Sequence, residues 1–321
     1  MRDQLQVYAH YGVTTVFSLG GDGEAGVRVR DRQTEPGLDR ARLFVAGRVV
    51  TGTTPEDAAQ QVAQVVDRRA DWVKIRVDDN LGTTPKMSEP VFRAVIEESH
   101  KRGKRLAAHL YYLADAKALL RAGTDLLAHS VRDKEVDDEL IALLKARDVC
   151  YCPTLMREVS TFVYENRPDF FDDSFFTRHA DPAVLSALED PAYQQRMRES
   201  KSAQQYKIAL DMAKRNLKTL SDAGVRVAMG TDTGPAARFQ GYFEHRELEL
   251  MVDAGLTPMQ ALVSATGDAA RCMQVGAELG TLQPGKWADF VVLASNPLDD
   301  IKNTRTLESV WVAGNQLGEG S

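Results

Sequence analysis

The chain has 321 residues, of which 43% are hydrophobic and 27% charged, and its formal net charge is −6. This length suits one large domain with an appendage, or two domains. The negative charge argues against a broad basic surface for nucleic acid, and no apolar run is long enough to span a bilayer. The first residues lack the layout of a signal peptide, so we expect a cytoplasmic protein by default, with an upstream targeting segment left open.

Short apolar segments alternate with longer segments of helical period along most of the chain. The helical patterns between the segments include two that begin at the cap residues Thr54 and Ser88. This alternation predicts a parallel sheet with right-handed crossovers, as an open doubly wound sheet or a barrel. The expected strands are residues 12–20, 41–47, 71–77, 105–112, 125–131, 149–155 and 225–232.

Two later segments break the alternation. Residues 156–200 are rich in Phe, Asp, Arg and Pro, which indicates an active-site lid or a partner-binding insertion. The lid would have its own small core of phenylalanines. Beyond residue 276, three short β-like pieces joined by Gly, Pro and Asn turns predict a small β appendage. The core phenylalanines would be Phe170, Phe171, Phe175 and Phe176.

The strand at 71–77, "DWVKIRV", places Lys74 opposite a wholly apolar face made of Val73, Ile75 and Val77. A half-exposed strand would let this lysine meet water. In a strand buried on both faces, the amine must instead be neutralised, paired or bound, because an isolated buried charge is costly.

Polar residues also stand at the ends of other strands. His109 ends "LAAH", His129 ends "LLAH" and Asp232 ends "VAMGTD", as Lys74 ends its own strand. Each histidine alone could be a core imidazole. Four such groups at one edge of a parallel sheet favour a shared site, and nitrogen and oxygen ligands suit Zn²⁺ or a similar ion. Lysine can join such a site if its amine captures CO₂ as a carbamate.

The segments "VKI", "AH", "AHS" and "GTDTG", in this order, resemble the metal-dependent amidohydrolase superfamily. The closing segments "GLTPMQALVSATGDAAR", "LGTLQPGKWADFVVL" and "NPLDDI" strengthen the resemblance, which is closest to the imidazolonepropionase-like and prolidase-like branch. It implies a (β/α)₈ barrel with a β-sandwich and a binuclear centre, with two Zn²⁺ in the complete protein. Lys74 would be the carbamylated bridge, His109 and His129 would bind one ion, and Asp232 would bind the other and move the proton.

The sequence lacks the His-x-His pair that the family carries on its first strand. We therefore expect an N-terminally incomplete chain with a TIM-like (β/α)₈ barrel that lacks its first strand. The barrel would span residues 1–276, and residues 277–321 would be the remnant of the β-sandwich. The expected reaction of the complete protein is dipeptidase-like or prolidase-like hydrolysis of C–N bonds in a small molecule or dipeptide, including a cyclic amide. The alternatives are a metal-free barrel isomerase or lyase that holds a phosphorylated ligand at "GTDTG", and an inactive fragment.

Other residues have two interpretations each. Tyr111 and Tyr112 follow His109 and would contact substrate or pack in the core. Arg157 would clamp a substrate carboxylate or form a surface ion pair. His245 would face the pocket or cap a helix. We expect no nucleic-acid partner and no membrane span, and leave a homo-oligomer open.

Two further motifs receive a structural interpretation. Cys150 and Cys152 share a face of one strand and are too close in sequence for an easy bridge, so we expect reduced core thiols. Residues 20–26, "GGDGEAG", contain G-x-G-x-x-G after a strand. A clear helix does not follow in the sequence, so we expect a mobile loop and not a dinucleotide-binding turn.

Overall fold

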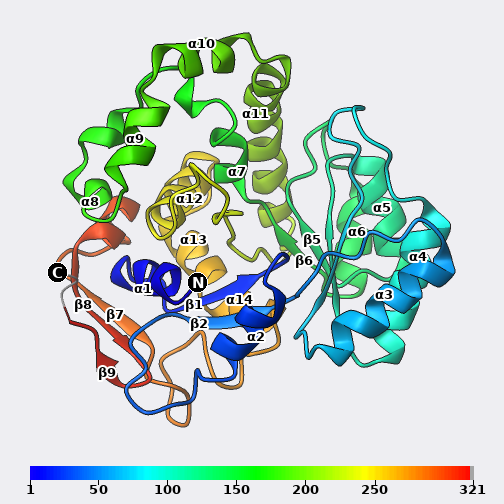
Figure 1. The fold of residues 1–321 in the computed structure, drawn as a ribbon, viewed down its shortest axis with the longest axis horizontal. Helices are drawn as coiled ribbons and strands as arrows, with labels where there is room; N and C mark the ends of the chain where they lie inside the picture. Colours follow the sequence, from blue (N-terminus) through cyan, green and yellow to red (C-terminus); the bar gives the residue numbers. More distant parts are fainter. Residues whose placement is uncertain (319–321) are drawn as a thin grey trace.

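The parallel strands follow one another in chain order, as the alternating pattern predicts. The computed structural model describes residues 1–318, and Figure 1 shows their arrangement. The first six strands are β1 (Thr15–Ser18), β2 (Arg42–Val45), β3 (Val73–Arg76), β4 (Leu106–His109), β5 (Leu126–Ala128) and β6 (Cys150–Cys152). β1 pairs with β2, and β3 to β6 form a four-stranded sheet in that order, with every pair parallel. Val50, which follows β2 in the chain, forms an isolated parallel bridge with Ile75 of β3.

The expected strand at 225–232 is much shorter than predicted. Val227 forms an isolated parallel bridge with Tyr151 of β6, and the Ala228 N–H donates to the Tyr151 carbonyl at 2.9 Å. The ladder ends there because the Met229 N–H donates instead to the Ser264 carbonyl, at 2.9 Å. The segment therefore adds a single parallel bridge beside β6 and does not form a full strand. A (β/α)₈ barrel that lacks its first strand stays a prediction.

Helices pack on the parallel strands and begin at recognisable caps. The Thr54 hydroxyl accepts the Asp57 N–H at 3.2 Å, and Pro55 fits the first turn of the helix that follows. Another helix ends at Gly123, whose φ of 111° favours glycine. Among residues 1–318, no helix is both long and apolar enough to cross a membrane. The main helices are α1 (Arg2–His10), α2 (Gly23–Arg30), α3 (Pro55–Asp67), α4 (Glu89–Lys101), α5 (Leu113–Ala122), α6 (Asp138–Ala146), α11 (Lys201–Asp222), α12 (Tyr242–Asp253), α13 (Pro258–Ala265) and α14 (Gly267–Cys272).

The prediction of a loop at 20–26 is wrong, because α2 begins inside the glycine-rich motif. Gly26 explains how this helix packs. A Cβ at this position would lie 3.2 Å from Val45 Cγ1 and 2.8 Å from Asp22 Cβ. The missing side chain therefore lets α2 approach β2 closely.

The insertion at 156–200 folds into short helices beside α12 (Figure 1). Phe171, Phe175 and Phe176 are buried together with Tyr242 and Phe243 of α12. The phenylalanines therefore form a core, as predicted, but they share it with α12. The insertion comprises α7 (Leu155–Val159), η1 (Val163–Glu165), η2 (Asp169–Asp172), α8 (Ser174–Thr177), α9 (Pro182–Leu188) and α10 (Pro191–Glu199).

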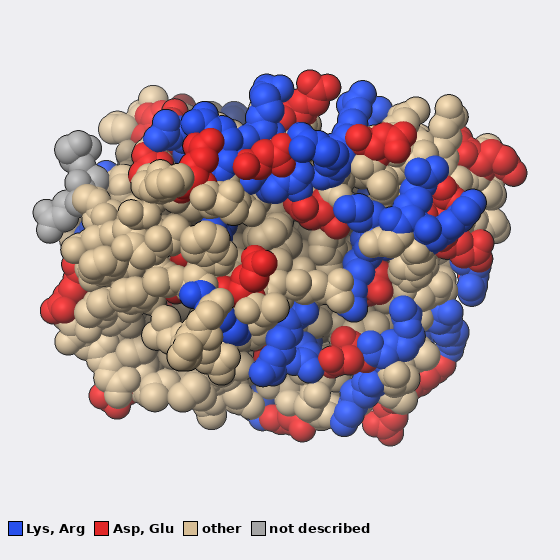
Figure 2. All heavy atoms as spheres, turned by 90° about the horizontal axis from the view of Figure 1, so that it is seen from below, with Lys and Arg blue, Asp and Glu red and all other residues tan. Residues whose placement is uncertain are grey.

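The last part of the chain forms the expected β appendage. β7 (Phe290–Leu293), β8 (Leu307–Val312) and β9 (Asn315–Gln316) make an antiparallel sheet, with η3 (Ile301–Arg305) between β7 and β8. Figure 2 shows acidic and basic side chains intermixed on one face of the molecule, with few charges on the side where Figure 1 places this sheet. The domain boundary at 276 stays a prediction. Exposed apolar side chains in this part are Leu282, Trp287, Val291, Val292 and Leu298.

The prediction of reduced core thiols is wrong for Cys150 and correct for Cys152. Cys150 of β6 forms a disulfide with Cys272 at the end of α14, 122 residues later in the chain. Cys150 and Cys152 do share a buried face, but that face meets α14, which brings Cys272 to a Cα–Cα distance of 5.9 Å. Cys152 remains a buried free thiol.

A buried ion pair fastens the antiparallel sheet to β2. Arg42 Nε donates to Asp289 Oδ2 at 2.6 Å, and the two side chains are only 2% and 4% exposed. Asp289 Oδ1 also accepts the Ala313 N–H at 2.6 Å, and the Arg42 guanidinium lies 4.3 Å from the centroid of the Trp287 ring. The pair therefore connects two parts of the chain that lie far apart in sequence.

We predict that Asp289→Ala lowers the free energy of unfolding by about 3 to 5 kcal/mol, because it leaves the Arg42 charge buried without a counter-ion. Urea denaturation measures this loss. Asp299→Ala, which removes an exposed carboxylate from the same segment, is the control and should change stability by less than about 0.5 kcal/mol. Equal effects of the two substitutions would contradict the prediction.

Candidate active site

Lys74 lies inside the sheet, on a strand buried on both faces. Its neighbours Val73 and Ile75 are fully buried against the helices, and Lys74 itself is only 6% exposed. Within residues 1–318 its amine makes no hydrogen bond or ion pair. Burial lowers the pKa of Lys74 to about 8, although the charge of Asp232 opposes this shift. The second interpretation of the strand, with a buried amine, is confirmed.

The two predicted histidines meet at the carboxyl ends of β4 and β5. The ring centroids of His109 and His129 lie 4.3 Å apart, with the rings edge to face. His109 Nε2 donates to Asp78 Oδ2 at 2.6 Å, and His129 Nδ1 shares a hydrogen bond of 2.6 Å with the Thr154 hydroxyl. One nitrogen of each ring is thus held by a neighbour, which leaves His109 Nδ1 and His129 Nε2 available to a ligand. Metal-binding imidazoles usually have this arrangement.

Both imidazoles are kept neutral. Burial lowers the pKa of His109 to about 4, even though the Asp78 carboxylate favours its protonation. Burial also lowers the pKa of His129 far below its ordinary value, and the charges of His109 and Lys74 act in the same direction. Burial opposes ionisation of Asp78, yet its hydrogen bond to His109 holds the pKa of this carboxyl below its usual range. A neutral imidazole keeps the lone pair that a metal ion requires.

Asp232 lies close enough to Lys74 for its charge to act on the amine, but its carboxylate has another partner. Its carboxylate forms an ion pair with Arg238, whose Nη1 also donates to the Asp232 carbonyl at 3.1 Å. Its charge still influences the pKa of Lys74. In the part of the chain that the structure describes, no three His, Cys, Asp or Glu side chains are placed to hold one metal ion together. The structure therefore brings two imidazoles and a lysine together, with Asp232 beside them.

Strained backbone positions carry these side chains. His129, Thr154 and Asp232 have φ values of 45°, 49° and 60°, in the left-handed region that non-glycine residues rarely adopt. Such strain persists where the surrounding structure enforces it, and it is common at functional sites. We infer that these backbone conformations at the strand ends fix the direction of the side chains of the candidate site, in addition to turning the chain.

A buried carboxylate enforces the turn after β6. Glu247 is fully buried, and its two oxygens accept the N–H groups of Leu155 at 2.8 Å and Met156 at 2.6 Å. These bonds fix the residues directly after Thr154, and Thr154 in turn holds His129. Sequence reasoning missed Asp78, Thr154 and Glu247. The strand-end rule could have indicated Asp78, which closely follows Lys74, whereas nothing in the local sequence marks Glu247.

Arg157 is paired but not at the surface. It is 7% exposed, its Nη1 donates to both oxygens of Glu158 at 3.0 and 3.1 Å, and its guanidinium lies 4.6 Å from the centroid of the Tyr206 ring. The alternative of a surface ion pair is wrong, because Glu158 is completely buried. The role of Arg157 as a substrate clamp stays a prediction.

The two tyrosines after His109 occupy different environments. Tyr111 is 4% exposed and lies under the Arg132 guanidinium, 4.5 Å from ring centroid to cation. The Tyr112 hydroxyl donates to Asp79 at 2.9 Å. Both therefore have packing or hydrogen-bond partners within the chain, and their contact with substrate stays a prediction.

His245 has a structural environment. Its Nε2 donates to the Tyr11 carbonyl at 2.8 Å and its Nδ1 shares a hydrogen bond of 2.9 Å with the Thr304 hydroxyl. The interpretation as a helix cap is wrong, because the ring connects α12 to residues after α1 and in η3. Burial lowers the pKa of His245 to about 4. None of its ring contacts within residues 1–318 reaches Lys74 or His109, so a role in substrate binding stays a prediction.

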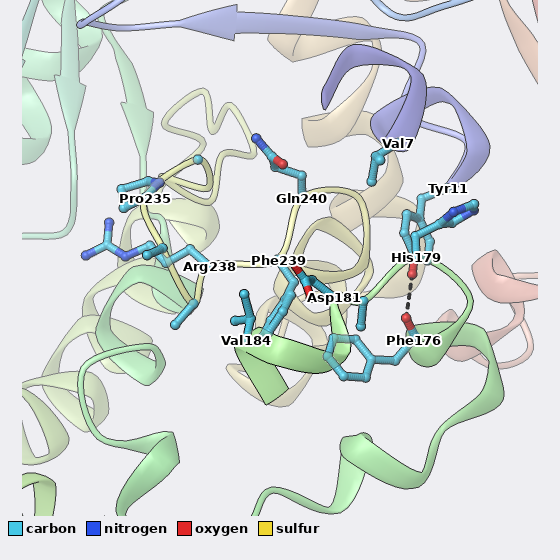
Figure 3. Close-up of a pocket in the computed structure, with 14 residues that line it drawn as sticks. Val7, Tyr11, Phe176, His179, Asp181, Val184, Pro235, Arg238, Phe239 and Gln240 are labelled. Atoms are coloured by element: carbon cyan, nitrogen blue, oxygen red, sulfur yellow. Dashed lines mark hydrogen bonds between the residues drawn. The ribbon is translucent and has the colours of Figure 1, made fainter. Parts of the chain in front are cut away.

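A cavity of about 220 Å³ opens at the loop that follows Asp232, with Arg238 and Gln240 of this loop in its wall (Figure 3). Its walls come from α1, from the insertion and from the loop that follows Asp232. Arg238, the ion-pair partner of Asp232, belongs to this lining. The cavity is therefore adjacent to one member of the candidate site.

Comparisons with known proteins identify the family of the chain and proteins with a similar fold. The sequence profile of the amidohydrolase family matches residues 12–317. Ochratoxinase of Aspergillus niger is 26% identical over 290 residues, which cover 86% of this chain and 52% of that protein. An imidazolonepropionase of Deinococcus deserti is 36% identical over 102 residues, 30% of this chain and 25% of that protein. A solved structure from Bifidobacterium longum, described as a prolidase, has a TM-score of 0.77 at 25% identity and covers 98% of this chain and 75% of that one. The chain thus spans about half the length of ochratoxinase.

We predict that His245 makes stability depend on acid pH. Its folded-state pKa of about 4 lies below the ordinary value of 6.5, so the unfolded chain takes up the proton first as pH falls. This contribution is complete above pH 6.5 and is lost as pH falls from 6.5 toward 4, by roughly 3 kcal/mol. Urea denaturation across this range should show a smaller loss in His245→Gln than in the wild type.

His100→Gln is the control, because His100 lies at the surface. An unchanged pH dependence in His245→Gln would contradict the prediction, because it would show that folding does not lower the pKa of this ring.

Proposed function

Because this chain belongs to the amidohydrolase family, we propose that it carries the reaction centre of a metal-dependent hydrolase that cleaves a C–N bond in a small molecule. The observation that carries the proposal is the pair of neutral imidazoles beside the buried amine of Lys74, at the carboxyl ends of β3, β4 and β5. The family supports hydrolysis, and the prolidase among the similar structures favours an amide or peptide bond.

The donor groups suit a divalent ion such as zinc. His109 Nδ1 and His129 Nε2 would be its ligands, because the other nitrogen of each ring is held by Asp78 or Thr154. A bound ion would lower the pKa of a coordinated water and polarise the substrate carbonyl. The chain itself contributes the fixed ring orientation and the buried surroundings.

Lys74 would join the site as a carbamate. Burial makes its amine easier to deprotonate, and the neutral nitrogen can attack CO₂. A nitrogen–carbon bond forms, and the amine proton leaves to solvent. The product is an anion, which replaces a buried and unpaired cation by an oxygen ligand of the charge that a divalent ion requires. This step would explain why the strand tolerates a lysine at this position.

Asp232 would move the proton. We propose that its carboxylate accepts a proton from the attacking water and later gives it to the leaving amine. The side chain is 40% exposed, so it can exchange protons with solvent, and Arg238 orients it. Pairing with Arg238 and binding to a metal ion would compete for the same carboxylate.

The metal-free alternative has less support. A phosphate nest at "GTDTG" would need free backbone N–H groups, but the Thr233 N–H donates to the Thr231 hydroxyl at 3.3 Å. The hydroxyls of Thr231 and Thr233 are also engaged, because both donate to Glu244 Oε1, at 2.6 and 2.7 Å. A buried carboxylate against this loop would repel a phosphate. We therefore favour the hydrolase.

Zinc binding should depend on Asp78. We predict that Asp78→Asn lowers zinc affinity 10- to 100-fold, because His109 loses the carboxylate that orients its ring and strengthens its donor nitrogen. Isothermal titration with zinc measures the affinity. Asp79→Asn, which changes the adjacent carboxylate that binds Tyr112, should leave it within about twofold of the wild type. Comparable affinities for all three proteins would argue against His109 as a ligand.

The hydrolase itself is tested by activity with dipeptides and N-acyl amino acids in the presence of zinc and bicarbonate. We predict that Lys74→Met and Asp232→Asn each lower kcat/KM at least about 100-fold. ¹³C NMR with labelled bicarbonate should show a carbamate in the wild type and none in Lys74→Met. Full activity in Lys74→Met would refute the proposed role of this lysine.

A further inference from the structure

We propose that the cavity in Figure 3 binds an uncharged, ring-sized apolar group and sets the specificity of the site. The part of this inference that concerns substrate rests on the proposed function. The binding of the ring does not depend on it.

The size and the walls of the cavity suit one ring. Its volume is about 220 Å³, which exceeds the about 150 Å³ that suffices for benzene in an enclosed apolar cavity; this cavity is open to solvent, and polar groups share its lining. Tyr11, Phe176 and Phe239 supply aromatic walls, and Val7 and Val184 supply aliphatic ones. A ring placed there would meet apolar carbon and ring edges on several sides.

The aromatic walls are held in place without a ligand. Tyr11 and Phe176 are 2% and 1% exposed, and the Tyr11 hydroxyl donates to the Phe176 carbonyl at 2.8 Å (Figure 3). The rings of Phe176 and Phe239 meet edge to face, with centroids 4.7 Å apart. The polar atom of Tyr11 is therefore already satisfied, and a preformed wall keeps the ordering entropy of binding low.

The charged side chains of the lining, and His179, contact other residues of the chain. Arg238 pairs with Asp232, the Asp181 carboxylate accepts the Ala183 N–H at 2.8 Å, and His179 stacks on His10 at 5.1 Å. A charged ligand would have to compete for these groups, whereas an apolar ring would not. The cavity therefore selects for an uncharged group.

The position of the cavity connects it with the reaction centre. Arg238 contacts Asp232 on one side and lines the cavity on the other. A ring seated here would lie beside the residue that we propose moves the proton. Phe176 and Val184 belong to the insertion at 156–200, which thereby acquires a role in choosing the substrate.

The test measures binding of 4-fluorobenzamide by ¹⁹F NMR without added metal, with fluoroacetamide as the probe that lacks the ring. Ala236→Trp fills the cavity from an exposed position in its lining, and Ala187→Trp adds the same side chain to an exposed position of α9 outside the lining. We expect Ala236→Trp to weaken 4-fluorobenzamide binding at least tenfold and Ala187→Trp to leave it unchanged. Equal binding by the two variants, or equal binding of the two probes, would overturn the proposal.

A second variant tests the same idea in the opposite direction. Val184→Ala enlarges the cavity, and we expect it to raise the affinity for 2-naphthamide relative to 4-fluorobenzamide by at least threefold. An unchanged ratio would contradict a binding site at this wall. Ring binding without hydrolysis of any amide would refute the proposed function and leave the cavity proposal intact. Hydrolysis of amides with equal binding of ring-containing and ring-free probes would refute the cavity proposal and leave the proposed function intact.

Discussion

A lysine amine inside a parallel sheet, with no ion pair among the described residues, constrains the rest of the candidate site. The apolar face of β3 packs against the helices that cover it. Lys74 therefore lies on the opposite face, among small side chains such as Ala107 and Ala128. A buried ammonium without a counter-ion is unstable, and a protein retains such a group where it has a chemical use. Conversion of the amine to a carbamate would remove the free-energy cost of a buried, unpaired ammonium. It would also create an oxygen ligand for a metal ion. The neighbouring imidazoles are neutral for the same physical reason, since burial disfavours their charged forms.

The support around these groups extends well beyond the strand ends. Glu247 on α12 fixes the turn after β6, that turn places Thr154, and Thr154 orients the ring of His129. Each link is a hydrogen bond to a buried group, so a substitution in α12 would change the position of the side chain that follows β5. The disulfide between Cys150 and Cys272 adds a covalent link from the same region to α14. The candidate site therefore depends on helices from the second half of the chain as much as on the strands that carry it.

Local periodicity in the sequence predicts the strands and the residues at their ends. Alternating apolar residues locate β3, and the rule that parallel strands end at one edge correctly predicts that His109 and His129 meet. The partners that complete the site could not be predicted, because they depend on contacts between distant segments: Glu247 lies more than 90 residues from the turn that it fixes, and Cys272 lies 122 residues from its disulfide partner. The helix at Gly23–Arg30 was missed for a related reason. Its polar sequence is a weak helix signal by itself, and its packing on β2 depends on the tight approach at Gly26.

X-ray absorption at the zinc edge, on the chain loaded with one equivalent of zinc, tests most directly whether these groups converge on a metal ion. We expect a first shell at about 2.0 to 2.1 Å that contains two imidazole nitrogens together with oxygen. Replacing His129 by Asn should remove one imidazole from this shell. A shell at about 2.3 Å, as thiolate sulfur gives, or a shell of oxygen alone, would contradict a metal centre built on His109 and His129.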